Sequence, residues 1–296
     1  MPELPEVETI RSDLAKKIVG RKITDFLLLS PKTLKNIDEA DFKKLIIGSQ
    51  IRKVKRRAKI IILDLNNDNN LIFHMKMTGH LLLEPSRFKV KKDGTWSIKE
   101  KELKDPFNQY IRAIFWLDND IIMAFSDLRK FGYIKLIKDE LIEDLLGDYG
   151  PEPFSKGFNH KYLKDLSSKR KISIKKLLMD QSLIAGIGNI YADEILFASK
   201  IHPEKAANKI TDKEIGLIIE NTKIILTKAI KMRGTSSSDY RDTSGKKGNY
   251  EKELLVYRRS NQPCRICQSK IERIVVGGRG THFCPNCQKE KSNKND

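Results

Sequence analysis

The four cysteines of this chain form two Cys-x-x-Cys pairs near its C-terminus, Cys264 with Cys267 and Cys284 with Cys287. A disulfide framework would spread its cysteines along the chain, whereas two such pairs separated by sixteen residues supply four thiolates for a tetrahedral zinc ion. Because all four positions are cysteine, we expect one structural Zn²⁺ per chain and no catalytic metal. The alternative is four unpaired cysteines. The clustering also indicates a reducing compartment.

The residues between the two pairs predict a two-stranded ribbon. Residues 271–276 and 281–283 are strand-like, and the glycine-rich residues 277–280 would form their turn. This places Arg279 at the tip of a zinc-held ribbon, where it could meet a phosphate. A zinc ribbon alone does not name a function.

The charge of the chain favours a polyanionic partner. It carries 57 Lys and Arg against 39 Asp and Glu, which gives a formal net charge of +18. Such an excess suits nucleic acid and disfavours basic partners. The longest apolar runs are far shorter than the roughly 18 residues of a membrane span, and the acidic N-terminus lacks the apolar core of a signal peptide. We therefore expect a cytoplasmic, nucleoid-associated protein with no membrane partner.

The pattern in the first half predicts one helix followed by many strands. Residues 6–17 carry apolar side chains at helical spacing, and Gly20 would end the helix. We expect a β-sandwich or barrel with this helix packed on it over residues 1–146, and a long surface loop at residues 86–108. The strand-like runs are residues 23–29, 51–57, 60–65, 71–77, 111–117, 121–125 and 131–137.

The second half predicts helices. Residues 147–155 are rich in glycine and proline and are expected to be a linker. We assign residues 156–250 to a helical domain and residues 251–296 to the zinc ribbon, so the fold class is α+β with several domains. Expected helices cover residues 173–179, 190–199 and a segment that starts at the capping box formed by Thr211 and Glu214. Its apolar stripe is Ile215, Ile218, Ile219, Thr222, Ile225, Leu226 and Ala229.

The N-terminus could carry covalent chemistry. Removal of Met1 would leave Pro2 with a secondary amine, which can attack an aldehyde-like carbon and form an iminium. Such an amine titrates near roughly 7.7–8.0, and Glu3 and Glu6 stand close enough in sequence to act as acids or bases. The structural alternative is a helix start, since proline at residue 5 and the nearby acidic residues suit a helix N-terminus.

Three motifs resemble the bacterial formamidopyrimidine-DNA glycosylases. Residues 2–9 are similar to the N-terminus of that family, and residues 180–194 resemble its helix-two-turn-helix signature. His202 and Pro203 follow as they usually do there, and the four-cysteine ribbon with Arg279 is similar too. These motifs span the chain in the order of the family.

The resemblance implies a monomeric base-excision repair enzyme acting on damaged double-stranded DNA, with the duplex running across a basic cleft between the domains. The enzyme flips an oxidised purine, such as 8-oxoguanine or a formamidopyrimidine, out of the stack. Pro2 attacks C1′ and displaces the base, with Glu3 as proton donor and Glu6 in support. The Schiff base then undergoes β- and δ-elimination, which is the abasic-site (AP) lyase activity.

Further residues take their roles from the same resemblance. Lys59 corresponds to a catalytic lysine that contacts phosphate, and Arg279 would hold the phosphates around the lesion. Met77, Arg129 and Phe131 would fill the space that the flipped nucleotide leaves. The remaining candidates would bind the DNA backbone, and they are His74, Lys175 and Asn189.

Each of these positions also has a plain structural interpretation. Lys59 belongs to a basic strand that could be a solvated face, and a strand histidine such as His74 is often structural. Met77 and Phe131 would be core residues without the resemblance. Asn189 would be a helix cap, and Lys175 would lie on a solvated helix face.

The chain departs from the family pattern in three places. Arg258 and Asn261 stand where glycine is usual, and residues 237–240 are irregular in the loop that caps the flipped base in relatives. The preferred base therefore stays open. One competing hypothesis is an endonuclease VIII-like enzyme for oxidised pyrimidines, against which Leu4 argues because glycine is usual there in that sister family. The other is a non-catalytic zinc-ribbon DNA-binding protein.

Overall fold

The computed structural model describes residues 1–85, 88–90, 96–98, 105–236 and 239–289. Two compact units make up the chain. The first comprises Met1–Gly147 and Ile230–Glu251, and the second comprises Asp148–Ala229 and Lys252–Asp296. The sequence analysis assigned residues 230–250 to the helical domain, whereas in the structure this stretch has its contacts within the first unit.

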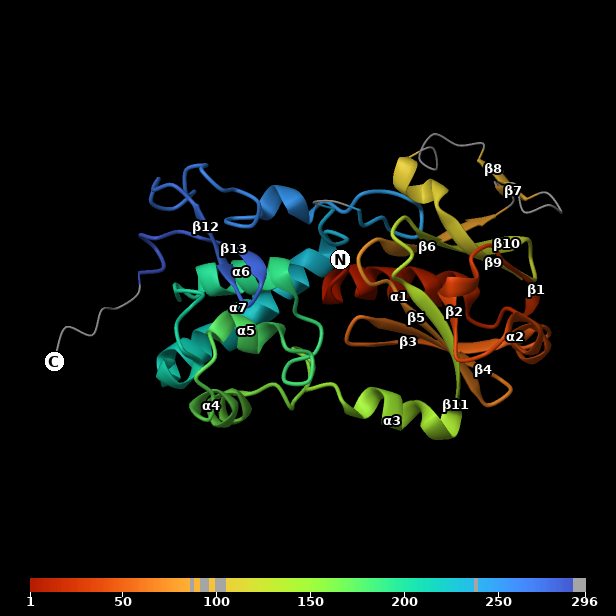
Figure 1. The fold of residues 1–296 in the computed structure, drawn as a ribbon, viewed down its shortest axis with the longest axis horizontal. Coiled ribbons are helices and arrows are strands. Elements are labelled where there is room, and N and C mark those ends of the chain that lie inside the picture. The colour runs from red at the N-terminus through yellow and green to blue at the C-terminus, as the bar shows by residue number, and fades with distance from the viewer. Residues whose placement is uncertain (86–87, 91–95, 99–104, 237–238, 290–296) are drawn as a thin grey trace. The chain divides into compact units, whose positions relative to one another are not determined.

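Two sheets form the body of the first unit (Figure 1). One sheet has the order β1-β9-β10-β6, and the other has the order β2-β11-β5-β4-β3. All neighbouring strands run antiparallel except β2 and β11. The strands of the first sheet are β1 (Ile23–Leu28), β9 (Ile111–Leu117), β10 (Ile121–Asp127) and β6 (Gly79–Pro85). Those of the second are β2 (Leu34–Lys35), β11 (Tyr133–Lys138), β5 (Asn69–His74), β4 (Ile60–Leu65) and β3 (Ile51–Arg57).

Helix α1 (Leu4–Ile18) packs against this body and completes its core. Its side chains at helical spacing, Val7, Ile10, Leu14 and Ile18, are fully buried, as the pattern predicts. A second helix, α2 (Glu39–Ile46), adds Phe42, whose ring lies 4.8 Å from that of Phe26. The sequence analysis did not predict α2, since eight residues give a weak periodic signal. The β-sandwich with a packed helix is confirmed.

The segment 86–108 is not the long loop that its polar composition suggests. Strands β7 (Phe88–Val90) and β8 (Trp96–Ile98) pair as a short antiparallel hairpin, and a 3₁₀ helix, η3 (Pro106–Gln109), follows. Residues 86–87, 91–95 and 99–104 lie outside the described residues. The loop expectation is therefore wrong for the described part, because three-residue strands are too short to show alternation in the sequence.

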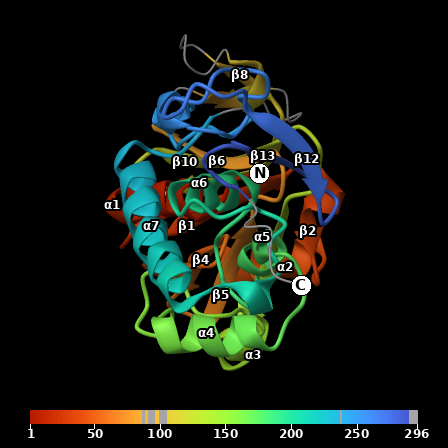
Figure 2. The same cartoon turned by 90° about the vertical axis from the view of Figure 1, so that its left-hand side faces the viewer.

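Helices build most of the second unit (Figure 2). They are α4 (His160–Ser168), α5 (Ile174–Met179), α6 (Asn189–Ala198) and most of α7 (Asp212–Lys231), whereas α3 (Ile142–Gly147) ends the first unit's long segment. The capping box of α7 forms as predicted, since Thr211 N–H donates to Glu214 Oε2 over 2.8 Å. Its predicted stripe is buried except for Ile219, which is half-buried.

The C-terminal ribbon consists of β12 (Glu272–Val276) and β13 (Arg279–Phe283). Gly277 and Gly278 form the turn, and both have positive φ, which suits a tight hairpin. The predicted ribbon is thus confirmed, with a shorter turn than expected. No helix among the described residues is long and apolar enough to cross a membrane.

Candidate active site and zinc centre

The first turn of α1 holds two buried carboxylates beside the N-terminus. Glu3 is the N-cap residue, and its backbone N–H donates to Glu6 Oε2 over 2.8 Å. Glu3 is 2% exposed and Glu6 1%. The helix-start interpretation and the catalytic one therefore describe the same residues, because the cap itself positions the Glu6 carboxylate.

A second backbone donor fixes Glu6 from the segment after α7. Thr235 N–H donates to Glu6 Oε1 over 2.7 Å. The preceding Gly234 has φ +78°, and a Cβ there would lie 2.7 Å from Glu6 Oε1 and 2.8 Å from Glu6 Cγ. Only glycine allows this approach. Both oxygens of Glu6 accept backbone hydrogen bonds, so its negative charge is held in one orientation.

The amino group at the start of the chain lies in this carboxylate pocket. Burial lowers the pKa of the Met1 amino group from its ordinary value of 8.0, while the charges of Glu3 and Glu6 oppose that shift. Lys59 lowers the same pKa further. The buried carboxylates of Glu3 and Glu6 and the cation of Lys59 therefore act together on the charge at the start of the chain.

Lys59 differs from the cations of the preceding strand, β3. It is 5% exposed in the turn between β3 and β4, next to Ala58 with φ +51°. Lys55, by contrast, is exposed and pairs with Asp64 over 2.7 Å, and Arg56 pairs with Glu8 over 2.8 Å. The solvated-face interpretation therefore suits Lys55, whereas Lys59 belongs to the pocket around the N-terminal amine.

His74, at the end of β5, is held as a neutral ring. Lys76 N–H donates to its Nδ1 over 3.0 Å, and burial lowers its pKa to about 3. Because Nδ1 accepts, the ring proton is on Nε2, which leaves an N–H available as a donor. Such a donor can bind a phosphate oxygen without carrying charge.

The three proposed void-filling residues lie on two neighbouring turns. Asp127 pairs with Gly79 in the β10–β6 ladder, and its carboxylate accepts from the Thr78 hydroxyl and from Gly132 N–H. Arg129 N–H donates to Thr78 Oγ1 over 3.0 Å. The turn with Met77 is thereby joined to the turn with Arg129 and Phe131. The sequence analysis missed Asp127, since an acidic residue at a strand end carries no specific signal.

The exposure of these side chains separates the two interpretations. Phe131 is 53% exposed, and the guanidinium of Arg129 lies over its ring, 4.7 Å from the centroid. Met77 is half-buried. The core interpretation is wrong for Phe131, because more than half of this side chain is exposed.

In the second unit, Asn189 and Arg279 lie close to Gly280. Asn189 Nδ2 donates to the Gly280 carbonyl over 2.9 Å, while its buried Oδ1 has no hydrogen-bond partner among the described residues. Arg279 is exposed and next to the ribbon turn. The cap of α6 is Gly188, with Asn189 as the first helical residue, so the cap interpretation of Asn189 is wrong.

Lys175 does not face solvent or a ligand. It is fully buried, and its Nζ lies 2.6 Å from Asp193 Oδ1 and 2.7 Å from Thr281 Oγ1. Both the phosphate-contact prediction and the solvated-face alternative therefore need correction. A helix of six residues is too short for its periodicity to show whether Lys175 or Lys176 points inward. Lys175 holds strand β13 against α5, and its neighbour Lys176 is the exposed one.

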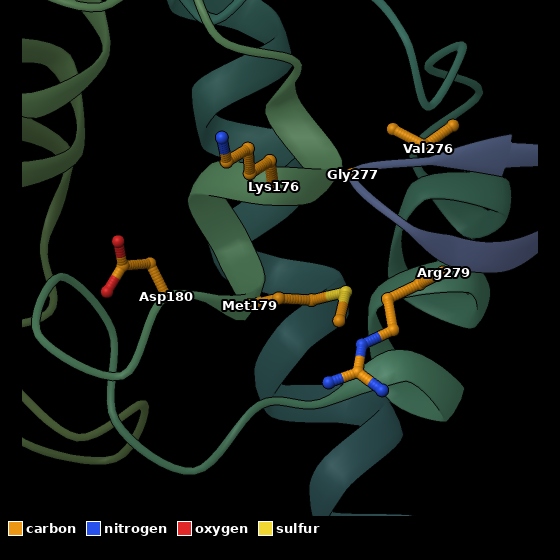
Figure 3. Close-up of a pocket in the computed structure, with 6 residues that line it drawn as sticks. All are labelled: Lys176, Met179, Asp180, Val276, Gly277 and Arg279. Atoms are coloured by element: carbon orange, nitrogen blue, oxygen red, sulfur yellow. The ribbon is translucent and has the colours of Figure 1, made fainter.

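A shallow pocket of about 200 Å³ lies between α5 and the ribbon turn (Figure 3). Met179 extends from α5 toward the strand that carries Arg279, and Lys176 lies one turn further up the helix. The lining residues of the pocket are Lys176, Met179, Asp180, Val276, Gly277 and Arg279.

The four cysteines converge as a metal site. All four Sγ atoms lie within 4.8 Å of one another, with 3.9 Å between Cys264 and Cys287 and 3.4 Å between Cys267 and Cys284. Tetrahedral zinc with bonds of about 2.3 Å needs sulfur atoms at about 3.8 Å. Ile266 N–H and Cys287 N–H point at the sulfurs of Cys264 and Cys284, which suits thiolates. The residues fit one structural Zn²⁺.

Comparisons with known proteins agree with this site. Residues 1–134 match the model of the formamidopyrimidine-DNA glycosylase N-terminal domain, and residues 149–241 match its H2TH domain. Residues 261–289 match a zinc finger found in FPG and IleRS. Formamidopyrimidine-DNA glycosylases of Pelotomaculum thermopropionicum and Ligilactobacillus salivarius are each 38% identical over 98% and 99% of this chain and 100% of their own length.

Solved structures give the same result. A Lactococcus lactis FPG mutant in complex with Fapy-dG-containing DNA is 35% identical, with a TM-score of 0.85, and the match covers 98% of this chain and 100% of that one. The wild-type L. lactis protein in complex with oxidised-pyrimidine DNA is also 35% identical, covers the same shares and has a TM-score of 0.84. The chain therefore belongs to the formamidopyrimidine-DNA glycosylase family.

Proposed function

We propose that this chain is a bifunctional base-excision repair enzyme that removes oxidised purines from duplex DNA and then cleaves the abasic site. The observation that carries the proposal is the start of α1, where Glu3 and Glu6 are buried beside the first residues of the chain and both oxygens of Glu6 accept backbone hydrogen bonds. Relatives support it, since L. lactis proteins of this family were solved with Fapy-dG DNA and with abasic-site DNA.

The chemistry starts after Met1 is removed. The Pro2 nitrogen attacks C1′ of the flipped nucleotide and forms a C–N bond, while the bond from C1′ to the base breaks. The base leaves with the bonding electron pair and takes the proton that the Pro2 nitrogen releases. Glu3 gives a proton to O4′ as the C1′–O4′ bond breaks and the nitrogen lone pair forms the iminium, whose positive charge is stabilised by the fixed charge of Glu6. The resulting iminium acidifies the neighbouring sugar carbon, so β- and then δ-elimination releases both phosphates.

The remaining residues hold the duplex. Lys59 and the Nε2–H of His74 bind phosphates from the first unit, whereas Asn189 and Arg279 do so from the second. Met77, Arg129 and Phe131 occupy the space of the extruded nucleotide, with Arg129 hydrogen-bonding the orphaned base. The zinc keeps Arg279 on a rigid ribbon. The protein acts as a monomer, in the cytoplasm and on the nucleoid.

Borohydride trapping tests the proposal directly. A duplex with 8-oxoguanine opposite cytosine is incubated with the protein and borohydride, and the adduct is mapped by peptide mass spectrometry. The mature N-terminus is measured in the same sample. An adduct on the Pro2 nitrogen is expected. An adduct on a lysine would contradict the nucleophile, and tight duplex binding without any adduct would favour the non-catalytic DNA-binding alternative.

A lesion panel tests the substrate class. The oxidised-pyrimidine complex of the L. lactis relative is the specific observation for including pyrimidines. Excision rates on 8-oxoguanine, a formamidopyrimidine and an oxidised pyrimidine are compared under single-turnover conditions. We expect the purine lesions to react faster. A preference for the pyrimidine would support the endonuclease VIII-like alternative.

A further inference from the structure

We propose that the ion pair between Asp105 and Arg241, called the bolt below, holds the segment after α7 in place over the damaged base. Both are therefore positioning residues for base excision. The capping segment is defined here as the described residues 234–236 and 239–249. The inference rests on the proposed function, and it places this segment over the flipped base because Thr235, near the start of the segment, contacts Glu6. Asp105 precedes η3, at the end of the stretch to which the sequence analysis assigned no role.

The bolt is made by one buried guanidinium. Arg241 is 2% exposed, and its Nε and Nη2 donate to Asp105 Oδ2 over 2.9 and 2.8 Å. Its Nη1 donates to the Tyr240 carbonyl over 2.8 Å, and its plane lies 4.9 Å from the ring centroid of Phe107. The arginine therefore connects the backbone of the capping segment to both ends of the turn that begins η3.

A second tie lies next to the first. Asn108 is fully buried, and its Nδ2 donates to the Gly245 carbonyl of the capping segment over 3.1 Å. Its Oδ1 lies 3.0 Å from Nε2 of His80, a buried ring whose pKa is lowered to about 4 by burial. A neutral His80 donating from Nε2 orients the Asn108 amide toward Gly245. Ser126 Oγ holds η3 itself by donating to the Phe107 carbonyl over 2.9 Å.

The other end of the capping segment touches the catalytic pocket. Thr235 N–H binds Glu6 there, and Arg233, just before the segment, pairs with Asp13 and Asp242. Ser236 Oγ donates to the Tyr240 carbonyl and accepts from Gly248 N–H. The segment is thus held near its start by Glu6 and in its middle by Asp105 and Asn108, while Asn249 at its end bonds back to Met232.

This arrangement predicts a separation of the two activities. Loss of the Asp105–Arg241 pair removes the contact between the capping segment and the residue before η3, and it releases that part of the segment. Excision of a base requires that segment in place, because a misplacement of about 1 Å can slow a reaction about a hundredfold. Cleavage of a preformed abasic site has no base to cover, so that step should continue.

The test measures both activities in the same variants. Single-turnover excision of 8-oxoguanine and cleavage of a preformed abasic duplex are compared for the wild type, Asp105→Asn and Arg241→Met. The matched control is Asp212→Asn, which removes a carboxylate from an exposed pair with Lys164 in the second unit. We expect excision to fall about tenfold or more in the two bolt variants, abasic cleavage to stay within about twofold, and the control to change neither.

Two results would overturn the inference, namely unchanged excision in both bolt variants or an equal loss of both activities. Arg241→Lys covers the case of misfolding, because lysine keeps the charge but loses the two-pronged contact. It should show the same separation at a melting temperature near that of the wild type, and a lysine variant with wild-type excision contradicts the bolt. Failure of the proposed function is distinguishable, since the wild type would then neither excise nor form an adduct.

Discussion

Helix α1 in the first unit and helix α6 in the second each bury acidic residues, yet the surroundings of those residues differ. At α1, Glu3 and Glu6 surround an amine of lowered pKa. At α6, Asp193 is paired with Lys175, and Glu194 accepts three backbone N–H groups, from Leu255, Val256 and Tyr257. Both sets are inaccessible, but only the first lies beside the N-terminal amine.

The difference teaches that burial of charge does not identify a catalytic residue. Asp193 also accepts from His282 N–H in β13, so this residue of α6 anchors the ribbon. The next residue, Glu194, anchors residues 255–257, which precede the ribbon. These acids replace hydration with fixed protein donors, which is a structural use of buried charge. The α1 carboxylates are fixed in the same way. In addition, their charges oppose the lowering of the pKa of the Met1 amino group by burial.

The largest expected effect contrasts Glu3 with Glu194. Glu3→Gln should reduce single-turnover excision by about 10² to 10⁴-fold, because it removes a proton donor, and should leave the melting temperature nearly unchanged. Glu194→Gln should do the reverse, lowering the melting temperature while the folded fraction keeps its excision rate. Thermal unfolding and excision are measured on both proteins. A stable, inactive Glu194→Gln protein would break the comparison.

Removal of one partner of the buried pair tests the structural use of charge in the second unit. Lys175→Met leaves Asp193 buried without its cation, which should lower the free energy of unfolding by about 3–5 kcal/mol. Lys164→Met is the control, since its exposed pair with Asp212 should contribute less than about 1 kcal/mol. Urea denaturation measures both. Equal losses of unfolding free energy in the two variants would contradict the assignment of Lys175 as a buried residue that stabilises the second unit.

Acid should destabilise the first unit through its buried histidine. Burial lowers the pKa of His80 from 6.5 to about 4, so the unfolded chain binds this proton first as the pH falls. The free energy of unfolding should therefore decrease between pH 6.5 and about 4, by up to about 1.4 kcal/mol per pH unit from this group. The free energy of unfolding of the wild type and of His80→Gln is measured by denaturation across that pH range. An identical dependence of this free energy on pH in the variant would exclude His80 as the cause.

The smallest effect concerns Arg258 and Asn261, the two residues near Cys264 that stand where the family usually has glycine. Arg258 has φ +58° and Asn261 has φ +64°, so both adopt the left-handed conformation that glycine tolerates. Arg258→Gly should relieve strain of about 1–2 kcal/mol, partly offset by the flexibility of glycine in the unfolded chain. Asn261→Gly should change the melting temperature less, because asparagine accepts this conformation. A larger gain at Asn261 would reverse the expected order.

Much of the fold could be predicted because long periodic or alternating segments leave a clear pattern. Strands β4 and β9 agree with their predicted bounds, and α1 and α7 were recognised from apolar spacing and capping residues. The two-residue strand β2 and the hairpin of β7 and β8 were missed, since so few residues carry no period. Strand β6 and helix α4 were missed too, although they are longer. The Gly, Ser and Lys content of the capping segment is typical of a loop exposed to solvent, whereas its described residues Thr235, Ser236, Tyr240 and Arg241 are buried.

The candidate site was predicted from motifs rather than from burial. The N-terminal residues and the two cysteine pairs were found because their chemistry depends on local spacing, which a sequence records. The inward position of Lys175, the exposure of Phe131 and the role of Asp127 depend on contacts with residues far away in the chain. Such contacts leave no local signal, so the sequence analysis could assign these three only by resemblance or not at all.

By itself, the sequence determined the zinc ligands, the polyanionic partner class, the helix-two-turn-helix segment and the amine that Met1 removal would expose. These features need only residue type and spacing. Only the tertiary structure decided that Gly234 and Thr235 lock Glu6, that Lys175 points inward to Asp193, and that Asp105 meets Arg241 across more than a hundred residues of chain. The physical reason is that buried charges need partners, and the fold, not the local sequence, determines which partner arrives.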